Sequence, residues 1–299
     1  MDWRRPNSAR QPRASGVATA LGAYALLIAC EAFAVPPPKL IRLEQSPPRS
    51  RNSLDLPEGA YVGPTIPGLL QDAIPQGLAF LEPQRWFLIS CDFDDNRPSV
   101  LVAIDEKSGA MVRCLTIINK DGSPHTGHVG GLALSEKKVW IGSKAVYDAP
   151  LRAIVAARPV DYLRVGKAFQ AECKASYLTF ADGCLWVGEF VKAGHEDYGG
   201  VKEHRLADRQ GGVKHAWACA YALDRQDNVI GVKGHKAPSP SAVLATPECV
   251  QGMAFVGDSI FVSASYGNAP SSLEVYANPL REEGAGPHTI KIVGDSEFR

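Results

Sequence analysis

One short pattern recurs four times in the chain, and it constrains the fold more than any other feature of the sequence. Each copy is an apolar segment that begins with a small or polar residue, followed by a turn and a β-branched and aromatic run. The copies read QGLAFLEPQRWFLIS from Gln76, GGLALSEKKVWIGS from Gly130, SYLTFADGCLWVGEF from Ser176 and QGMAFVGDSIFVSAS from Gln251. A pattern that returns in this way indicates repeated structural units, each with a β-hairpin at its start.

Further strand candidates follow the hairpins. The third strand is clearest in SVLVAIDEKSG, HAWACAYALDRQDN and SSLEVYANP, and a fourth closes several units as MVRCLTII, NVIGVKG and HTIKIV. Four antiparallel strands with a Gly- and Ala-rich first strand are the pattern of a β-propeller blade. We therefore predict an all-β fold, a β-propeller with four readable blades, with five as the alternative count. The best helical candidate is DAPLRAIVAARPVDYLRV, an insert in the second blade that Pro150 and Pro159 would shorten.

The first 34 residues have a different character. Several arginines precede the uncharged run SGVATALGAYALLIAC, which is shorter than the roughly 20 apolar residues of a spanning helix. This layout predicts a signal peptide, 1–34, with AFA at Ala32–Ala34 as the cleavage signal. LIAC at Leu27–Cys30 resembles a bacterial lipobox, which makes a lipid-modified Cys30 the alternative, and an uncleaved anchor is the third option. We expect an exported protein, either secreted or periplasmic, or a membrane-anchored lipoprotein.

The remaining chain divides into a linker and a folded domain. The stretch 35–60 is rich in Pro, Arg and Ser and is expected to be a disordered linker, so the propeller domain would span 61–299. Seven cysteines in an exported chain invite disulfides, but Cys114, Cys184 and Cys219 lie in apolar strand-like runs, so we expect at most one disulfide. The 32 basic and 32 acidic residues balance and no Lys/Arg cluster follows the N-terminus, which argues against a nucleic-acid partner.

The blade topology selects candidate ligand-binding residues. The loops that lead into the innermost strands and the loops between second and third strands converge on one mouth of the central channel. The ligand-binding residues predicted at this mouth are Gln76, Ser176, Tyr177, Gln251, Tyr266 and Asn268. The glutamines could instead join neighbouring blades. Three tryptophans hold equivalent positions in the expected second strands: Trp86, Trp140 and Trp186. This regularity predicts that their side chains pack between blades.

Metal binding is a second prediction for the same mouth. The segment PHTGH places His125 and His128 before an innermost strand, and CDFDDN places carboxylates after a second strand. The candidate metal ligands are Asp92, Asp94, Asp95 and His128. Ca²⁺ would take the carboxylate oxygens, whereas Zn²⁺ would favour histidine. The competing interpretation is that both histidines serve only the turn and that the acidic loop is a solvated hairpin tip.

Four segments, PQGLAF, PHTGHVGGLAL, ASYLTFADGCLWVGEF and VQGMAF, together resemble a group of exported bacterial β-propeller proteins of unassigned activity. The resemblance extends over roughly Ile74 to Val293 and implies a fold and an exported location. More distantly, the layout resembles the regucalcin, gluconolactonase and strictosidine-synthase-like propellers, some of which are Ca²⁺-dependent hydrolases with a glutamate leading into an innermost strand. Gln76 and Gln251 hold the corresponding positions here, and a neutral amide supplies neither an anionic ligand nor a general base.

Three functions remain from the sequence. The first is an exported propeller that binds a small molecule, a glycan or a protein at the channel mouth without chemistry. The second is a metal-dependent esterase or lactonase, in which Ca²⁺ would polarise a carbonyl and His125 or His128 would act as general base. The third is a structural or assembly module that binds partners at its blade edges. No G-x-S-x-G motif, phosphate loop or dinucleotide fingerprint is present.

Overall fold

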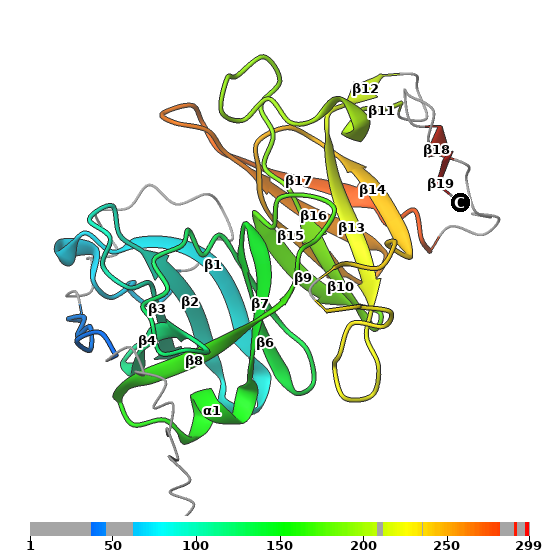
Figure 1. Ribbon diagram of the computed structural model, residues 1–299. Helices are drawn as coiled ribbons and strands as arrows, with labels where there is room; N and C mark the ends of the chain where they lie inside the picture. Colours follow the sequence, from blue (N-terminus) through cyan, green and yellow to red (C-terminus); the bar gives the residue numbers. More distant parts are fainter. Residues whose placement is uncertain are drawn as a thin grey trace, which may run out of the picture. The chain divides into compact units, whose positions relative to one another are not determined.

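The computed structural model describes residues 37–45, 62–207, 212–234 and 236–281, with the strand backbone of Ile290–Lys291 and Glu297–Phe298. The expected signal peptide, 1–34, and Cys30 lie outside these residues. Among the described residues no helix is long and apolar enough to cross a membrane. Nearly all regular structure is β, and it forms four successive antiparallel meanders (Figure 1).

The first two blades form one eight-stranded sheet. Blade 1 contains β1 (Ile74–Leu81), β2 (Trp86–Asp92), β3 (Val100–Asp105) and β4 (Met111–Asn119), and blade 2 contains β5 (Gly131–Leu134), β6 (Lys138–Ser143), β7 (Ala145–Pro150) and β8 (Val160–Phe169). Their outer strands β4 and β8 pair in parallel, from Cys114 with Val160 to Asn119 with Val165. The inner strands β1 and β5 also pack together, so the sheet encloses a core of Leu88, Leu115, Ile117, Ile141 and Leu163.

The third and fourth blades are separate sheets. Blade 3 contains β9 (Tyr177–Ala181), β10 (Cys184–Gly188), β13 (Ala216–Ala222) and β14 (Ala242–Thr246), and blade 4 contains β15 (Val250–Val256), β16 (Ser259–Ala264) and β17 (Ser272–Ala277). The inner strands follow one another in space as in the chain, because β5 packs against β9 and β9 against β15. This is the β-propeller arrangement expected from the sequence, and the described residues form four blades.

Small residues on the inner strands allow this close packing. A Cβ added at Gly77 in β1 would lie 2.6 Å from the Leu132 side chain of blade 2. A Cβ at Gly131 in β5 would lie 2.7 Å from Leu178 Cγ of blade 3. Gly131 and Gly252 hold matching positions in their blades, where Gly131 pairs with Gly142 and Gly252 with Ser263. The Gly- and Ala-rich first strand of the repeat therefore reflects contact between blades.

Short elements fill the connections. They are the 3-10 turns η2 (Leu69–Gln71), η3 (Glu82–Gln84) and η4 (Lys202–His204), the helix α1 (Leu151–Ala156) and the strand pairs β11 (Leu206–Ala207) with β12 (Val213–Lys214) and β18 (Ile290–Lys291) with β19 (Glu297–Phe298). The helical insert expected around α1 is thus a single short helix, because β7 continues to Pro150 and β8 begins at Val160.

Two sequence expectations about strands and linker were wrong in part. NVIGVKG contributes only turns and isolated bridges, and the fourth strand of blade 3 is β14, which pairs with β13. The expected linker differs at residues 37–45, which pack against blade 1: Leu43 is buried and the Ile41 N–H donates to Thr116 Oγ1 at 2.8 Å. Of HTIKIV only Ile290–Lys291 is described, and this strand, β18, pairs with β19.

Candidate functional site

A pocket of about 820 Å³ lies where the inner strands and their adjoining loops meet. It is lined by Gln76, His128, Lys144, Gln170, Lys174, Ala175, Ser176, Phe190, Tyr198, Gln251, Ser265, Tyr266 and Gly267. The residues come from all four blades, and most stand either just before an innermost strand or just after a second strand. We call this cavity the mouth pocket. Its size suits a small organic molecule.

The blade topology explains why these residues meet. Gln76 and Gln251 precede Gly77 and Gly252 at the start of their inner strands, and Ser176 precedes Tyr177 in the same way. Phe190 and Ser265 follow β10 and β16, where the chain returns to the same end of the blade. An up-and-down meander places both positions at one end of each blade.

The structure gathers most of the predicted ligand-binding residues. Gln76, Ser176, Gln251 and Tyr266 line the mouth pocket, together with His128. Tyr177 and Asn268 do not. Tyr177 is buried between blades, and its ring occupies the space that a Cβ at Gly188 would need, 2.0 Å from its Cζ. Asn268 is exposed beyond the lining. Tyr177 is therefore a packing residue, and its place next to Ser176 in the sequence conceals this.

Asp92 is held by two lining residues. Its carboxylate accepts a hydrogen bond from Gln76 Nε2 at 2.9 Å and contacts His128 Nδ1 at 2.6 Å. Burial raises the pKa of Asp92, but the hydrogen bonds from His128 and Gln76 outweigh it, and the pKa falls below its ordinary value. The Asp92 carboxylate thereby fixes the side chains of Gln76 and His128 at the rim.

The other predicted metal ligands are not part of this contact. Asp95 pairs with Arg97 at 2.7 Å, and Asp94 and Asp95 border a different recess that also includes Asp72. Over the described ranges, no three His, Cys, Asp or Glu side chains gather in a way that could hold a metal ion. The structure thus brings Asp92 and His128 together, and it separates Asp94 and Asp95 from them.

His125 lies inside the protein, away from the mouth pocket. It is only 5% exposed, its Nδ1 contacts Asn119 Oδ1 at 3.0 Å, and its ring meets Tyr147 edge-on at 4.8 Å. Burial lowers the pKa of His125, which keeps the ring neutral at physiological pH. A buried imidazole that is absent from the lining has no route to a ligand in the pocket, so of the two predicted bases only His128 is placed to meet one.

Two lysines that the sequence patterns did not indicate also line the mouth pocket. Lys144 is the single residue between β6 and β7, with a left-handed backbone (φ 60°), and its carbonyl accepts a hydrogen bond from Gln170 Nε2 at 2.8 Å. Lys174 precedes β9, next to Ala175, whose backbone forms a bridge with Lys144. In IGSKAVYD the turn-type residues before Lys144, Gly142 and Ser143, still belong to β6, so the composition does not mark Lys144 as a link between strands.

An aromatic wall forms one side of the pocket. Phe190 and Tyr198 come from the long loop of blade 3 and Tyr266 comes from blade 4, with Phe190 and Tyr198 meeting edge-on at 5.3 Å and Tyr198 and Tyr266 at 6.4 Å. His195 lies between the two tyrosines, 4.9 Å from Tyr198, and Lys192 Nζ stands 3.5 Å above the Tyr266 ring. The pocket thus combines apolar ring faces with amide and cationic groups.

A buried ionisable pair supports the base of that loop. Glu189 Oε1 contacts His204 Nδ1 at 2.7 Å and accepts a hydrogen bond from the backbone N–H of Trp217 at 3.1 Å. The His204 ring stacks on Trp217 at 3.9 Å with an interplanar angle of 15°. Glu189 directly precedes Phe190, so this pair anchors the chain where the aromatic wall begins. Removing either partner would leave a buried polar group without its hydrogen bond, which is costly.

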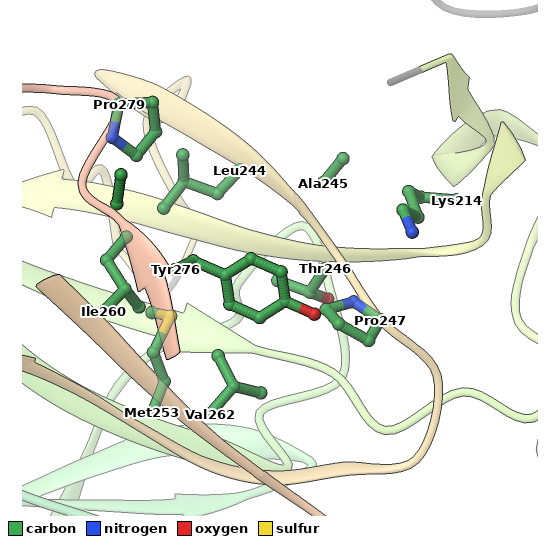
Figure 2. Close-up of a pocket in the computed structure, with 11 residues that line it drawn as sticks. Lys214, Leu244, Ala245, Thr246, Pro247, Met253, Ile260, Val262, Tyr276 and Pro279 are labelled. Carbon is green, nitrogen blue, oxygen red and sulfur yellow. The ribbon is translucent and has the colours of Figure 1, made fainter. Parts of the chain in front are cut away.

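A second cavity, of about 170 Å³, lies between blade 3 and blade 4 (Figure 2). Its lining is mostly apolar and includes Leu244, Met253, Ile260 and Val262. Figure 2 shows the Tyr276 ring across the cavity, with its hydroxyl directed toward Thr246 and Pro247. Partial burial and the neighbouring Glu274 carboxylate raise the pKa of Tyr276 to about 12. With few polar groups converging on it, this cavity is a gap in the packing between two blades.

No protein-family model matches the sequence, and no curated protein matches it. By structure, the chain is similar to a glycosyl hydrolase from Bacteroides ovatus, with a TM-score of 0.41, 8% identity, and coverage of 74% of this chain and 67% of that one. It is also similar to a quinonprotein alcohol dehydrogenase-like protein from Bacteroides thetaiotaomicron (TM-score 0.33, 14% identity, coverage 74% and 44%). A third similarity is to the hydrazine synthase of Kuenenia stuttgartiensis (TM-score 0.35, 8% identity, coverage 80% and 70%). At such identities and TM-scores, these likenesses carry no inference about activity.

Proposed function

We propose that this chain is a binding protein whose mouth pocket holds a small hydroxylated ring compound, such as a sugar or a short glycan, without breaking a bond in it. The observation that carries the proposal is the composition of the lining. Amides of Gln76, Gln170 and Gln251 face the same cavity as the rings of Tyr198 and Tyr266. Aromatic faces accept the apolar side of a ring compound, and amides exchange hydrogen bonds with its hydroxyls.

A binding function fits the residues better than hydrolysis does. Asp92 and His128 form a carboxylate and imidazole pair at the rim, where the two contact each other and Asp92 also accepts a hydrogen bond from Gln76. The other predicted base, His125, is buried. General acid–base catalysis needs a group within hydrogen-bond reach of the reacting atom, and a metal-dependent reaction needs several converging ligands.

The test is a sugar and glycan panel against the purified protein, with thermal unfolding as the first readout and calorimetry for the hits. We expect Gln251→Ala and Tyr198→Ala to weaken binding of a hit by about tenfold each, the effect of losing one contact of about 1.4 kcal/mol. Gln226→Ala is the matched control, because Gln226 is also exposed but lies outside the lining. The ligand should be recovered unchanged. Equal loss in the control, or conversion of the ligand to a cleaved product, would contradict the proposal.

We propose further that this binding takes place outside the cytoplasm. The support comes from the charged, then apolar, then small-residue order of residues 1–34. Mass spectrometry of the protein recovered from its native envelope checks this. A new N-terminus after Ala34 indicates signal peptidase, and a lipid on Cys30 indicates the lipoprotein route. An intact Met1 on cytoplasmic protein would rule out export.

A further inference from the structure

The mouth pocket is lined by cationic groups and by no carboxylate. Of its lining residues, all within the described ranges, Lys144 and Lys174 carry full positive charge and His128 carries it when protonated, whereas none is Asp or Glu. The whole chain, in contrast, has equal numbers of acidic and basic residues. A one-sided charge in a cavity of a neutral protein favours a ligand of the opposite sign.

The two ammonium groups have no competing partner within the described residues. No carboxylate there lies within ion-pair distance of Lys144 or Lys174. Lys138, by comparison, contacts Asp148 at 2.7 Å. Asp92 contacts two lining residues, and its two oxygens are taken by Gln76 and His128. The charges of the two lysines therefore remain available to a ligand.

The backbone brings the two lysines to the same side of the pocket. Lys144 forms an isolated bridge with Ala175, the residue that follows Lys174. Lys144 adopts a left-handed backbone conformation that a lysine rarely takes and that glycine or asparagine would adopt at lower cost. The Lys144 side chain lines a ligand-sized cavity from this tight turn, which supports a role for its ammonium group.

We infer that the ligand of the mouth pocket carries an anionic group, as an acidic sugar does, and that Lys144 and Lys174 bind this group together. The inference rests on the proposed function, because it names the class of ligand for the same pocket. In this arrangement the aromatic wall takes the ring of the ligand, and the lysines take its carboxylate or phosphate. Lysine binds either group as a point charge, so both belong to the same chemistry.

The experiment compares three probes that share one ring. Glucuronate and glucose 6-phosphate carry the anion as carboxylate and phosphate, and glucose carries none. Affinities for the wild-type protein are measured by calorimetry or by ligand-observed NMR at low and at physiological salt. We expect each acidic probe to bind at least tenfold more tightly than glucose, with the advantage shrinking as salt rises.

The variants are Lys144→Gln, Lys174→Gln and the double variant, with Lys167→Gln as the matched control for the loss of one charge. Lys167 is exposed on β8 and lies outside the lining. We expect each single change to reduce acidic-probe affinity about fivefold, the double change to make the acidic probes equal to glucose, and the control to have no effect. Lys174 lies outside the left-handed turn, so its variant tests the idea even if Lys144→Gln disturbs the loop.

Two failures can be told apart. If glucose binds as tightly as the acidic probes, or if Lys167→Gln weakens them as much as Lys174→Gln does, the anion inference is wrong while sugar binding at the mouth stands. If none of the three probes binds and no member of the wider glycan panel does, the proposed function itself fails, and the inference fails with it. Preference for only one of the two acidic probes supports the inference and identifies the anion.

Discussion

At the scale of single residues, Asp92 joins the stability of the fold to the shape of the mouth pocket. Its side chain is 14% exposed and is held by Gln76 and His128. Because its pKa is lowered in the folded state, the stabilisation that it provides is present above the unfolded-state pKa of about 3.9 and is lost as pH falls through the lower folded value. We predict that Asp92→Asn destabilises the protein by about 1–3 kcal/mol at pH 7, and that the gap from wild type closes below about pH 4.

Urea unfolding at several pH values between 7 and 3 measures that gap. Asp94→Asn, two residues further along the same loop, is the control, because Asp94 is exposed and the structure gives its carboxylate no ion pair within the described residues. A difference between wild type and Asp92→Asn that stayed constant down to pH 3 would show that the carboxylate charge is not what stabilises this contact.

At the scale of elements, inner strands approach each other closely only where they have no side chain. At Gly131 an added Cβ would stand 2.8 Å from the Leu178 backbone nitrogen, which cannot move aside as a flexible side chain could. We predict that Gly131→Ala destabilises the protein by about 1–3 kcal/mol through overpacking between blades 2 and 3. Gly166→Ala on β8 is the control, because the nearest atom there, Asp148 Oδ1, is 3.7 Å away, and no loss is expected. Thermal unfolding compares the two, and equal melting temperatures would contradict close packing at Gly131.

The sequence predicted the hairpins well and the outer strands less well, for a physical reason. Inner hairpins combine alternating apolar residues with short turns, a local signal that survives in a single sequence. The outer strands depend on long connections, so β14 was missed in favour of NVIGVKG. The sequence pattern also did not predict the register of the tryptophans in the second strands. Trp140 and Trp186 pair with Ala133 and Thr179, but the matching residue of blade 1 is Leu88, and Trp86 lies at the strand start opposite Leu81, partly buried beneath Arg113.

At the scale of the whole molecule, the propeller topology predicted where the mouth pocket lies but not all of the residues that line it. Knowing which loops share a mouth was enough to select Gln76, Gln251 and Tyr266 from the sequence. Lys144 could not be selected in this way, because a one-residue link between strands leaves no loop composition to notice. Tyr177 was selected wrongly as a ligand-binding residue, because only the space above Gly188 shows that its ring turns into the interior.

The last prediction concerns the sheet of blade 4, which has one buried face and one exposed face. Ile260 and Val262 on β16 are buried toward blade 3. Leu273 and Val275 on β17 lie on the opposite face of the sheet and are exposed, Leu273 by 67%. Val275 pairs with Phe261, and Phe261 with Ala254, so the exposed face is continuous across the sheet. Exposed apolar faces of this kind promote association.

We predict that Leu273→Ser with Val275→Thr lowers concentration-dependent association in sedimentation velocity and changes stability by less than about 1 kcal/mol. Ile260→Ala, on the covered face, should cost about 2–5 kcal/mol. Loss of stability in the double variant comparable with that of Ile260→Ala would mean that the outer face of blade 4 is covered in solution.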